Sequence, residues 1–220
     1  MESLYASQSP TRSATIDSSI EIRPARPDDR GPIAELMYSS GMDIYDYLFK
    51  TARKHPVDFI RHEFGAGSGF CGYRNVTVAV KDGVVVGTGC FYDRARYEQL
   101  VQGTGKNIFG FFGVFGAVPV LLRTRHSGSL MKPPRDGELY LANFGVDPAL
   151  RSHGIGTQMI RHMLTQARSQ NYRTFGLDVS VANPRGQALY ERLGMRVVRE
   201  KTFSGPADTV ANCRKMELSL

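Results

Sequence analysis

The segment best suited to bind a ligand is residues 151–157, Arg-Ser-His-Gly-Ile-Gly-Thr. An apolar run before it predicts a buried strand over 139–146, and apolar residues at helical spacing after it predict a helix over 154–171. Exposed backbone N–H groups and the positive end of the helix dipole meet at residues 152–157, where two glycines let a ligand approach the backbone. These features predict an anion site that would fit a pyrophosphate.

Two common pyrophosphate-binding loops do not match this segment. A Walker loop ends in Gly-Lys-Ser/Thr, whereas Gly156 is followed directly by Thr157 with no Lys. A dinucleotide-binding loop needs Gly-x-Gly-x-x-Gly and an acidic residue about twenty positions later, and only Gly154-x-Gly156 is present. For Gly-x-Gly taken alone, a tight strand-to-helix turn without a ligand is the alternative interpretation.

The longer pattern resembles a known family, the GNAT (general N-acetyltransferase) acyltransferases. Residues 151–156 match the family's R/Q-x-x-G-x-G/A signature, and they follow a strand that ends in Val-x-Pro. Residues 183–195, Asn-Pro-Arg-Gly-Gln-Ala-Leu-Tyr-Glu-Arg-Leu-Gly-Met, look like the family's N-x-x-A-x-x-L-Y-x-x-x-G-F/M segment. Both blocks stand in the family's order, and the resemblance covers residues 20–220 except for an insertion at about 93–135.

The resemblance implies the GNAT fold, which agrees with the pattern of the chain. Strand-like runs at 76–80 and 84–91 flank a Lys-Asp-Gly turn and predict a hairpin, and strands alternate with helices after it. We therefore expect an α/β (α+β mixed) protein whose central mixed sheet of about six to seven strands is flanked by helices. In this family the fourth and fifth strands, here 139–146 and 174–181, splay apart.

The resemblance also implies acetyl-CoA as co-substrate. Backbone groups of Phe144, Gly145 and Val146 would pair with the pantetheine arm and the acyl carbonyl, and the amides of residues 152–157 would hold the pyrophosphate. Arg151 could add charge, His153 could touch a phosphate, and Asn183 is expected both to cap a helix and to contact CoA. The predicted cofactor-binding residues are Phe144, Gly145, Val146, Arg151, Ser152, His153, Gly154, Ile155, Gly156, Thr157 and Asn183.

The family's reaction needs a proton donor and a proton acceptor. Tyr190 matches the family's general acid, and a phenol with a pKa of about 10 is a reasonable donor to a thiolate whose conjugate acid is about 8.5. Simple packing beside Leu189 is the alternative role for Tyr190. Glu138, which shares a strand face with Tyr140, is the predicted base, although it could equally be an exposed residue at the start of a strand. Further candidates for the base are Asp43, Asp46 and Asp178.

Three functions remain open on this basis. The first is acetyl-CoA-dependent transfer of an acetyl group to a primary amine of a small molecule, peptide or protein by direct attack. The second is a non-catalytic acyl-CoA-binding regulatory module. The third, nucleic-acid binding, has no supporting motif, so no nucleic-acid partner is expected. The five His residues form no cluster with metal-ligand spacing, and no metal site is predicted.

The charge of the chain is concentrated in the insertion. The whole chain has 28 Lys and Arg against 21 Asp and Glu, a formal net charge of +7. Residues 93–135 hold seven basic and two acidic residues, a net of +5, and surround a Gly- and Phe-rich run at 108–122. This run could be a substrate lid, a homodimer surface, a membrane-surface contact or a locally packed insertion.

Length and composition predict a single domain over residues 18–220 behind a flexible tail at 1–17, whose Ser- and Thr-rich sequence has little to bury. Three widely spaced cysteines are expected to be free thiols in a reducing compartment, and no signal-peptide pattern is visible, so a cytoplasmic location is predicted. The apolar run at 108–122 is shorter than the roughly 20 residues of a membrane-spanning helix, so no transmembrane segment is predicted.

Overall fold

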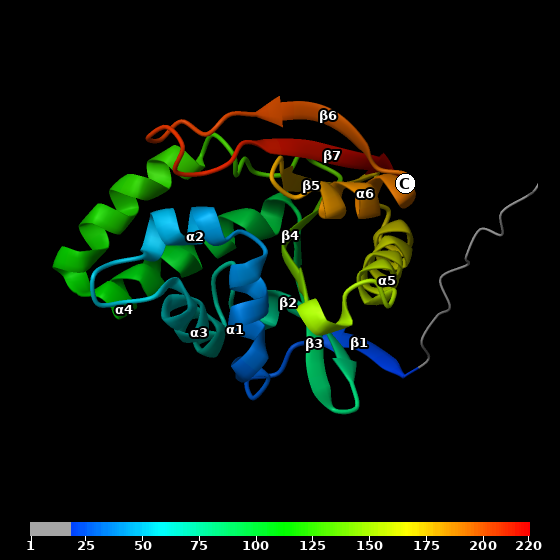
Figure 1. Cartoon of the computed structure of the whole chain (residues 1–220), viewed down its shortest axis with the longest axis horizontal. Helices are drawn as coiled ribbons and strands as arrows, with labels where there is room; N and C mark the ends of the chain where they lie inside the picture. The colour runs from blue at the N-terminus through cyan, green and yellow to red at the C-terminus, as the bar shows by residue number, and fades with distance from the viewer. Residues whose placement is uncertain (1–18) are drawn as a thin grey trace, which may run out of the picture.

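A seven-stranded mixed sheet forms the centre of the protein (Figure 1). The computed structural model describes residues 19–220, without the side chains of residues 30 and 31, so the predicted tail at 1–17 lies outside the described residues. The strand order is β1-β2-β3-β4-β5-β7-β6, in which β4 and β5 run parallel and the other neighbours antiparallel. The expected fold class is confirmed. The strands are β1 Ile20–Pro24, β2 Val76–Lys81, β3 Val84–Tyr92, β4 Glu138–Val146, β5 Thr174–Ser180, β6 Arg196–Lys201 and β7 Cys213–Ser219.

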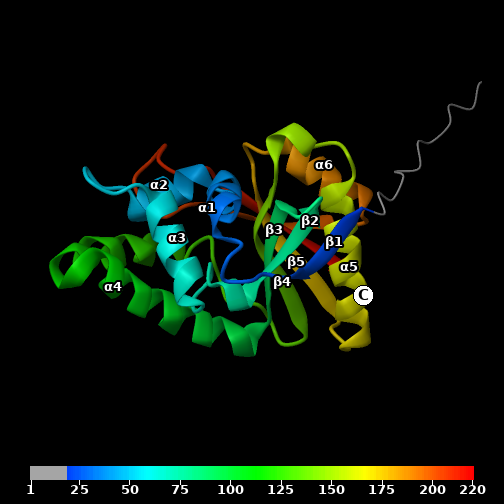
Figure 2. The same ribbon diagram turned by 90° about the horizontal axis from the view of Figure 1, so that it is seen from below.

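In the described part of the chain, six α-helices cover the two faces of the sheet (Figures 1 and 2). One face carries α1 Arg30–Ser39, α2 Met42–Phe49, α3 Pro56–Ala66 and α4 Arg94–Ser127, and the other carries α5 Ile155–Ser169 and α6 Pro184–Arg192. Each face has its own apolar core, with Ile33 and Phe59 fully buried on the first and Ile160 and Phe175 on the second. Short 3-10 turns at Tyr73–Asn75 and Pro148–Leu150 complete the described structure.

The insertion at 93–135 is mostly helical, which its sequence pattern did not predict. Asp93 caps the N-terminus of its helix α4, because the Asp93 side chain accepts a hydrogen bond from the Arg96 N–H at 2.8 Å. The helix bends at Gly113, where φ is 70° and ψ 173°. Glycines and Pro119 make this sequence a poor helix former in isolation. Burial of Leu100, Ile108, Ala117 and Val120 offsets that weakness through tertiary packing.

The helix α4 is unusual because most of its apolar stretch is exposed. Within residues 19–220, one helix is long and apolar enough to cross a membrane by length and composition, and that helix is α4. Only 22% of its apolar window is buried. This differs from the core helix of a globular domain, which hides its apolar residues.

A buried carboxyl group ties α4 to α3. Glu63 is 1% exposed, and its Oε1 accepts a hydrogen bond from Asn107 Nδ2 at 3.2 Å. Its Oε2 accepts from the Cys71 N–H at 3.1 Å, and Asn107 also donates to the Ser68 carbonyl at 2.9 Å. Burial raises the pKa of Glu63, although these donors oppose the rise. The cluster therefore joins α3, the loop that follows it and the first part of α4.

A β-bulge in β4 is the local feature that shapes the middle of the sheet. Opposite β3, Cys90 pairs with Ala142 and Thr88 pairs with Gly145, so β4 carries one extra residue between these pairs. Asn143 lies there with a φ of +50°, and its carbonyl accepts a hydrogen bond from the buried Thr88 hydroxyl at 3.2 Å. A bulge of this kind bends the strand that contains it. Beyond this point β4 turns away from β5.

Replacing Thr88 with Val tests how much the bulge depends on that hydroxyl. Val has almost the same shape but leaves the Asn143 carbonyl without this donor, so we expect a loss of about 1 kcal/mol in unfolding free energy. The midpoint of thermal unfolding should fall by about 2–4 °C. The control is Thr77→Val, at a half-buried position of the neighbouring strand β2. Equal stability of the two variants would show that the hydroxyl does not support the bulge.

Candidate active site

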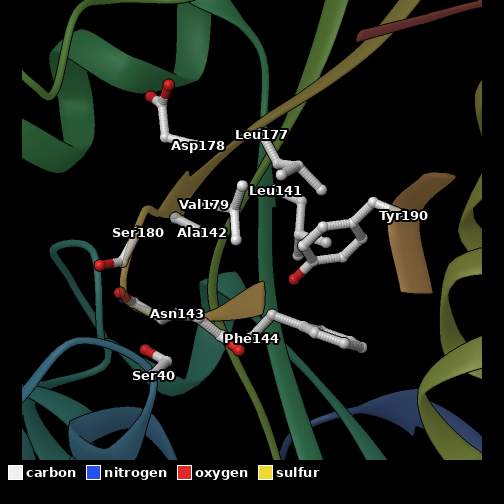
Figure 3. A pocket seen from close by; sticks show the side chains of 11 residues that line it. Ser40, Leu141, Ala142, Asn143, Phe144, Leu177, Asp178, Val179, Ser180 and Tyr190 are labelled. Atoms are coloured by element: carbon white, nitrogen blue, oxygen red, sulfur yellow. The ribbon is translucent and has the colours of Figure 1, made fainter. Parts of the chain in front are cut away.

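The parallel strands β4 and β5 separate at the centre of the sheet. Their pairing ends at Leu141 opposite Leu177, although β4 continues to Val146 and β5 to Ser180. Beyond Leu141, the β5-facing edge of β4 has no strand partner in the described part of the chain. The gap contains a pocket (Figure 3), which is lined by Ser40, Leu141, Ala142, Asn143, Phe144, Leu177, Asp178, Val179, Ser180, Asn183 and Tyr190.

Tyr190 extends from α6 into this pocket. Its side chain is 7% exposed, its ring centroid lies 6.5 Å from that of Phe144, and its hydroxyl points into the gap between the strands (Figure 3). No hydrogen-bond partner for this hydroxyl is found among residues 19–220. Burial raises the pKa of Tyr190 above its ordinary value, so the phenol remains protonated at neutral pH. It is a neutral donor with a free hydrogen facing the pocket.

Asn183 fixes the start of α6 and hence the position of Tyr190. Its Oδ1 accepts a hydrogen bond from the Gly186 N–H at 2.9 Å, and Pro184 occupies the first helical position. The predicted helix cap is confirmed. Asn183 also lines the pocket, so the same residue is placed to contact a ligand there.

The glycine-rich loop at 151–157 leads into α5 beside this pocket. Gly154 caps the helix with a φ of +85°, a left-handed conformation that favours glycine, and Ile155 is buried as an anchor. The first N–H groups of α5 have no acceptor within the helix, as at any helix N-terminus. Arg151, Ser152 and His153 are exposed ahead of them. This arrangement suits the predicted anion site.

A second arginine lies at this loop that the sequence patterns did not single out. Arg185, in the first turn of α6, donates a hydrogen bond from Nη2 to Ser152 Oγ at 3.3 Å. Arg151 instead turns back to the Val146 carbonyl at 3.2 Å, and His153 Nδ1 lies 3.0 Å from the Arg151 carbonyl. In the sequence, Arg185 is only a variable position of the block at 183–195. Its tertiary position reveals it as a partner of the loop.

Glu138, the predicted base, does not line the pocket. It lies at the start of β4, is 2% exposed, and forms an ion pair with Lys215, whose side chain is 12% exposed. Its Oε2 also accepts from the Arg135 N–H at 3.0 Å. Burial alone would raise the pKa of Glu138, but the hydrogen bonds from Lys215 and Arg135 outweigh it and lower the pKa. These contacts are those of a structural ion pair.

Asp178 is the carboxylate that does line the pocket. Its Oδ2 accepts hydrogen bonds from the Tyr140 hydroxyl at 2.5 Å and from Lys201 Nζ at 2.6 Å. Its Oδ1 is buried and has no partner among the described residues. Asp178 extends from the opposite face of β5 to Leu177, and its carboxylate points away from Tyr190 (Figure 3). Buried carboxylate oxygens are normally hydrogen-bonded, so this oxygen is an unused acceptor in the described structure.

The other two candidate bases from the sequence, Asp43 and Asp46, each accept hydrogen bonds from nearby groups. Asp43 accepts from the Ile44 and Ala211 N–H groups, and Asp46 from the Tyr38 hydroxyl and Lys50 Nζ. Neither lines the pocket. Within residues 19–220, no group of three or more His, Cys, Asp or Glu side chains is placed to hold a metal ion. Cys71, Cys90 and Cys213 are free thiols, as predicted.

Comparison with known proteins agrees with this geometry. The model of the acetyltransferase (GNAT) family matches residues 42–195, well over half of the chain. The structure of an N-acetyltransferase from Staphylococcus aureus Mu50 is similar with a TM-score of 0.66 and 18% identity, covering 90% of this chain and 100% of that one. A GCN5-related N-acetyltransferase from Kribbella flavida has a TM-score of 0.56 and 17% identity, covering 92% and 98%.

A third structure contains the cofactor of interest. It is a protein from Salmonella typhimurium, described as an acetyltransferase and solved with acetyl-CoA, with a TM-score of 0.53 and 17% identity over 92% of this chain and 95% of that one. No curated protein sequence matches significantly. The chain belongs to the GNAT acetyltransferase family, whose members use acetyl-CoA.

Replacing Glu138 with Gln distinguishes the two roles of this residue. The change leaves Lys215, whose side chain is only 12% exposed, without its counter-ion, so we expect a loss of about 3 kcal/mol in unfolding free energy at neutral pH. The folded-state pKa of Glu138 is lowered, so its stabilisation is complete above the unfolded pKa of about 4.3 and is lost as the pH falls below it. The difference between variant and wild type in urea unfolding should therefore shrink in acid.

Glu200→Gln provides the control, because Glu200 is exposed and pairs with Arg214 at the surface. This variant should change the unfolding free energy by at most about 1 kcal/mol. If Glu138→Gln were as stable as wild type but inactive, Glu138 would be catalytic after all.

Proposed function

We propose that this protein transfers the acetyl group of acetyl-CoA to an amine of a small molecule, peptide or protein. The observation that carries the proposal is the pocket between β4 and β5, into which the protonated hydroxyl of Tyr190 points. The free edge of β4 beyond Leu141 is open to hydrogen bonds with the pantetheine arm, in the way that an extended ligand adds to a strand edge. Phe144, Gly145 and Val146 form this edge.

The pyrophosphate of the cofactor would bind at the N-terminus of α5. The amides of residues 152–157 supply donors and the helix dipole favours negative charge. Arg185, held at Ser152 Oγ, adds a positive charge at the same place. Arg151 and His153 are exposed at the same loop, where their side chains can reach a phosphate.

The reaction is a direct displacement at the thioester carbonyl. The neutral amine nitrogen forms a bond with the carbonyl carbon, the carbon–sulfur bond breaks, and the thiolate of CoA takes the Tyr190 hydroxyl proton. The proton that the nitrogen loses as the amide forms then passes through water to the tyrosinate, which restores the Tyr190 hydroxyl. Burial raises the pKa of Tyr190, so its hydroxyl stays protonated until the thiolate forms, and the same burial makes that thiolate a stronger proton acceptor.

Asp178 is our proposed site for the incoming amine. Its buried Oδ1 can accept a hydrogen bond from the ammonium group, and its negative charge favours that group at the face of β5 away from Tyr190. The amine proton can then pass to the carboxylate before the attack. In this proposal Asp178 replaces Glu138 as the proton acceptor.

Replacing Tyr190 with Phe removes the acid and keeps the ring. We expect kcat to fall by about 10²–10⁴-fold, the usual contribution of a positioned general acid, with unchanged affinity for acetyl-CoA. Release of free CoA thiol with a panel of amines measures kcat, and calorimetric titration measures the affinity. Leu189→Met, in the same helix, is a packing control that should retain activity.

Two outcomes would contradict the proposed activity. If the wild type binds acetyl-CoA but releases no thiol above background with any amine, and Tyr190→Phe behaves identically, the protein is a non-catalytic acyl-CoA-binding module. If neither protein binds acetyl-CoA, the pocket has another ligand.

Replacing Asp178 with Asn tests the amine site. We expect kcat/KM for the amine to fall by about 10²-fold or more, with a higher KM for the amine and unchanged acetyl-CoA affinity. The exposed Asp136 provides a matched control as Asp136→Asn. Because Lys201 loses its counter-ion in the variant, acetyl-CoA binding also verifies that the protein is folded. An unchanged kcat/KM would exclude Asp178 as the amine site.

A further inference from the structure

The bend in α4 exposes a cluster of large apolar side chains. The helix lies at the end of the molecule opposite α5 and folds back there in both views (Figures 1 and 2). We call the cluster around Gly113 the α4 tip. Its members and their exposed fractions are Phe109 46%, Val114 68%, Phe115 95%, Val118 51% and Leu122 52%. A Phe exposed to this extent among four other exposed apolar residues is unfavourable in water unless something covers it.

The α4 tip is firmly attached to the protein. Phe112 packs on Phe59, with ring centroids 5.7 Å apart, and on Phe49, with centroids 6.4 Å apart. Lys54 donates to the Phe111 carbonyl, and its ammonium group lies 4.0 Å from the Phe111 ring centroid. These inward contacts hold the bend in place, so the outward residues form a fixed apolar projection.

Positive charge surrounds the α4 tip. Residues 99–135 contain no Asp or Glu, and α4 itself carries Lys106 before the bend and Arg123 and Arg125 after it. The segment between α2 and α3 adds Lys50, Arg53 and Lys54. This segment lies against α4, because Arg123 Nη1 donates to the Lys50 carbonyl at 3.4 Å and Lys54 donates to Phe111. The apolar tip therefore has a basic rim.

We infer that the α4 tip docks onto an anionic lipid surface. Phe115, Val114 and Val118 would enter the boundary between headgroups and acyl chains, while the basic rim contacts the negative headgroups. The combination of apolar insertion and charge attraction is what peripheral membrane binding requires. The bend at Gly113 and the packing on α2 and α3 keep α4 on the protein, so it lies at the surface of the bilayer without spanning it.

Charge argues against a second copy of the chain as the occupant. Two α4 tips facing each other across a two-fold axis would bring both basic rims together, and like charges across an interface are repulsive. An anionic lipid surface removes that repulsion and provides attraction in its place.

The absence of tryptophan from the chain allows a specific fluorescence test. Phe115→Trp places a single indole at the α4 tip, and Val198→Trp places one on the exposed strand β6 as a control. With vesicles of phosphatidylcholine and phosphatidylglycerol in equal parts, we expect a blue shift for Phe115→Trp and none for Val198→Trp. Pure phosphatidylcholine vesicles should produce a much smaller shift, and added salt should weaken binding to the anionic vesicles.

Flotation of the protein with the same vesicles measures the contribution of the α4 tip. The double change Phe115→Ser and Val118→Ser should reduce the bound fraction by about tenfold. The control Val84→Ser, at an exposed position beside the β2–β3 turn, should leave the bound fraction unchanged. The proposal is wrong if the wild type fails to float with anionic vesicles or if the double variant floats equally well. It is also wrong if the double change abolishes a concentration-dependent dimer in sedimentation experiments, since the tip would then be a protein interface. A wild-type protein that resists release by both high salt and alkaline carbonate would point to a spanning helix instead.

Discussion

The separation of β4 from β5 is the constraint on which the rest of the site depends. Two parallel strands would normally satisfy each other's backbone groups along their whole length, but here pairing ends at Leu141 and Leu177. The extra residue at Asn143 bends β4, and its carbonyl is held by the buried Thr88 hydroxyl. One strand edge is thereby left open beside Tyr190, Asn183 and the start of α5. Without this local irregularity, a continuous sheet would fill the position of the pocket.

The two faces of the sheet divide the work around that opening. On the α5 and α6 face, the glycine-rich loop at 151–157, the Asn183 cap and Tyr190 arise from two consecutive strand-to-helix units, so the family's two sequence blocks meet in space. On the other face, Asp178 is held by Tyr140 and Lys201, which come from β4 and β6. A cofactor and an acceptor approaching from opposite faces can meet in the gap. The insertion covers part of the same face as Asp178, since Leu100 packs there with Tyr92 and Tyr140.

Much of the fold could be predicted from local sequence patterns. The hairpin at β2 and β3, the strand β4 before the glycine-rich loop and the amphipathic helix α5 each follow from apolar periodicity and turn residues. The helix α4 could not, because its glycines and proline disfavour a helix locally and only burial against α2 and α3 compensates. The two carboxylates show the same limit at the site. Glu138 and Asp178 both lie on strands, and only their partners show that the first is neutralised by Lys215 and that the second keeps a free oxygen at the pocket.

The sequence by itself determined the family, the order of the elements, the glycine-rich loop at 151–157, the Asn183 cap and Tyr190 as a candidate acid. These depend on residues close together in the chain, where spacing decides which backbone groups and side chains share a turn. The tertiary structure alone decided which carboxylate reaches the pocket and that Arg185 contacts the glycine-rich loop. It also decided that the apolar insertion exposes Phe115 to solvent. Each of these depends on contacts between segments distant in sequence, and such contacts follow from packing of the whole chain.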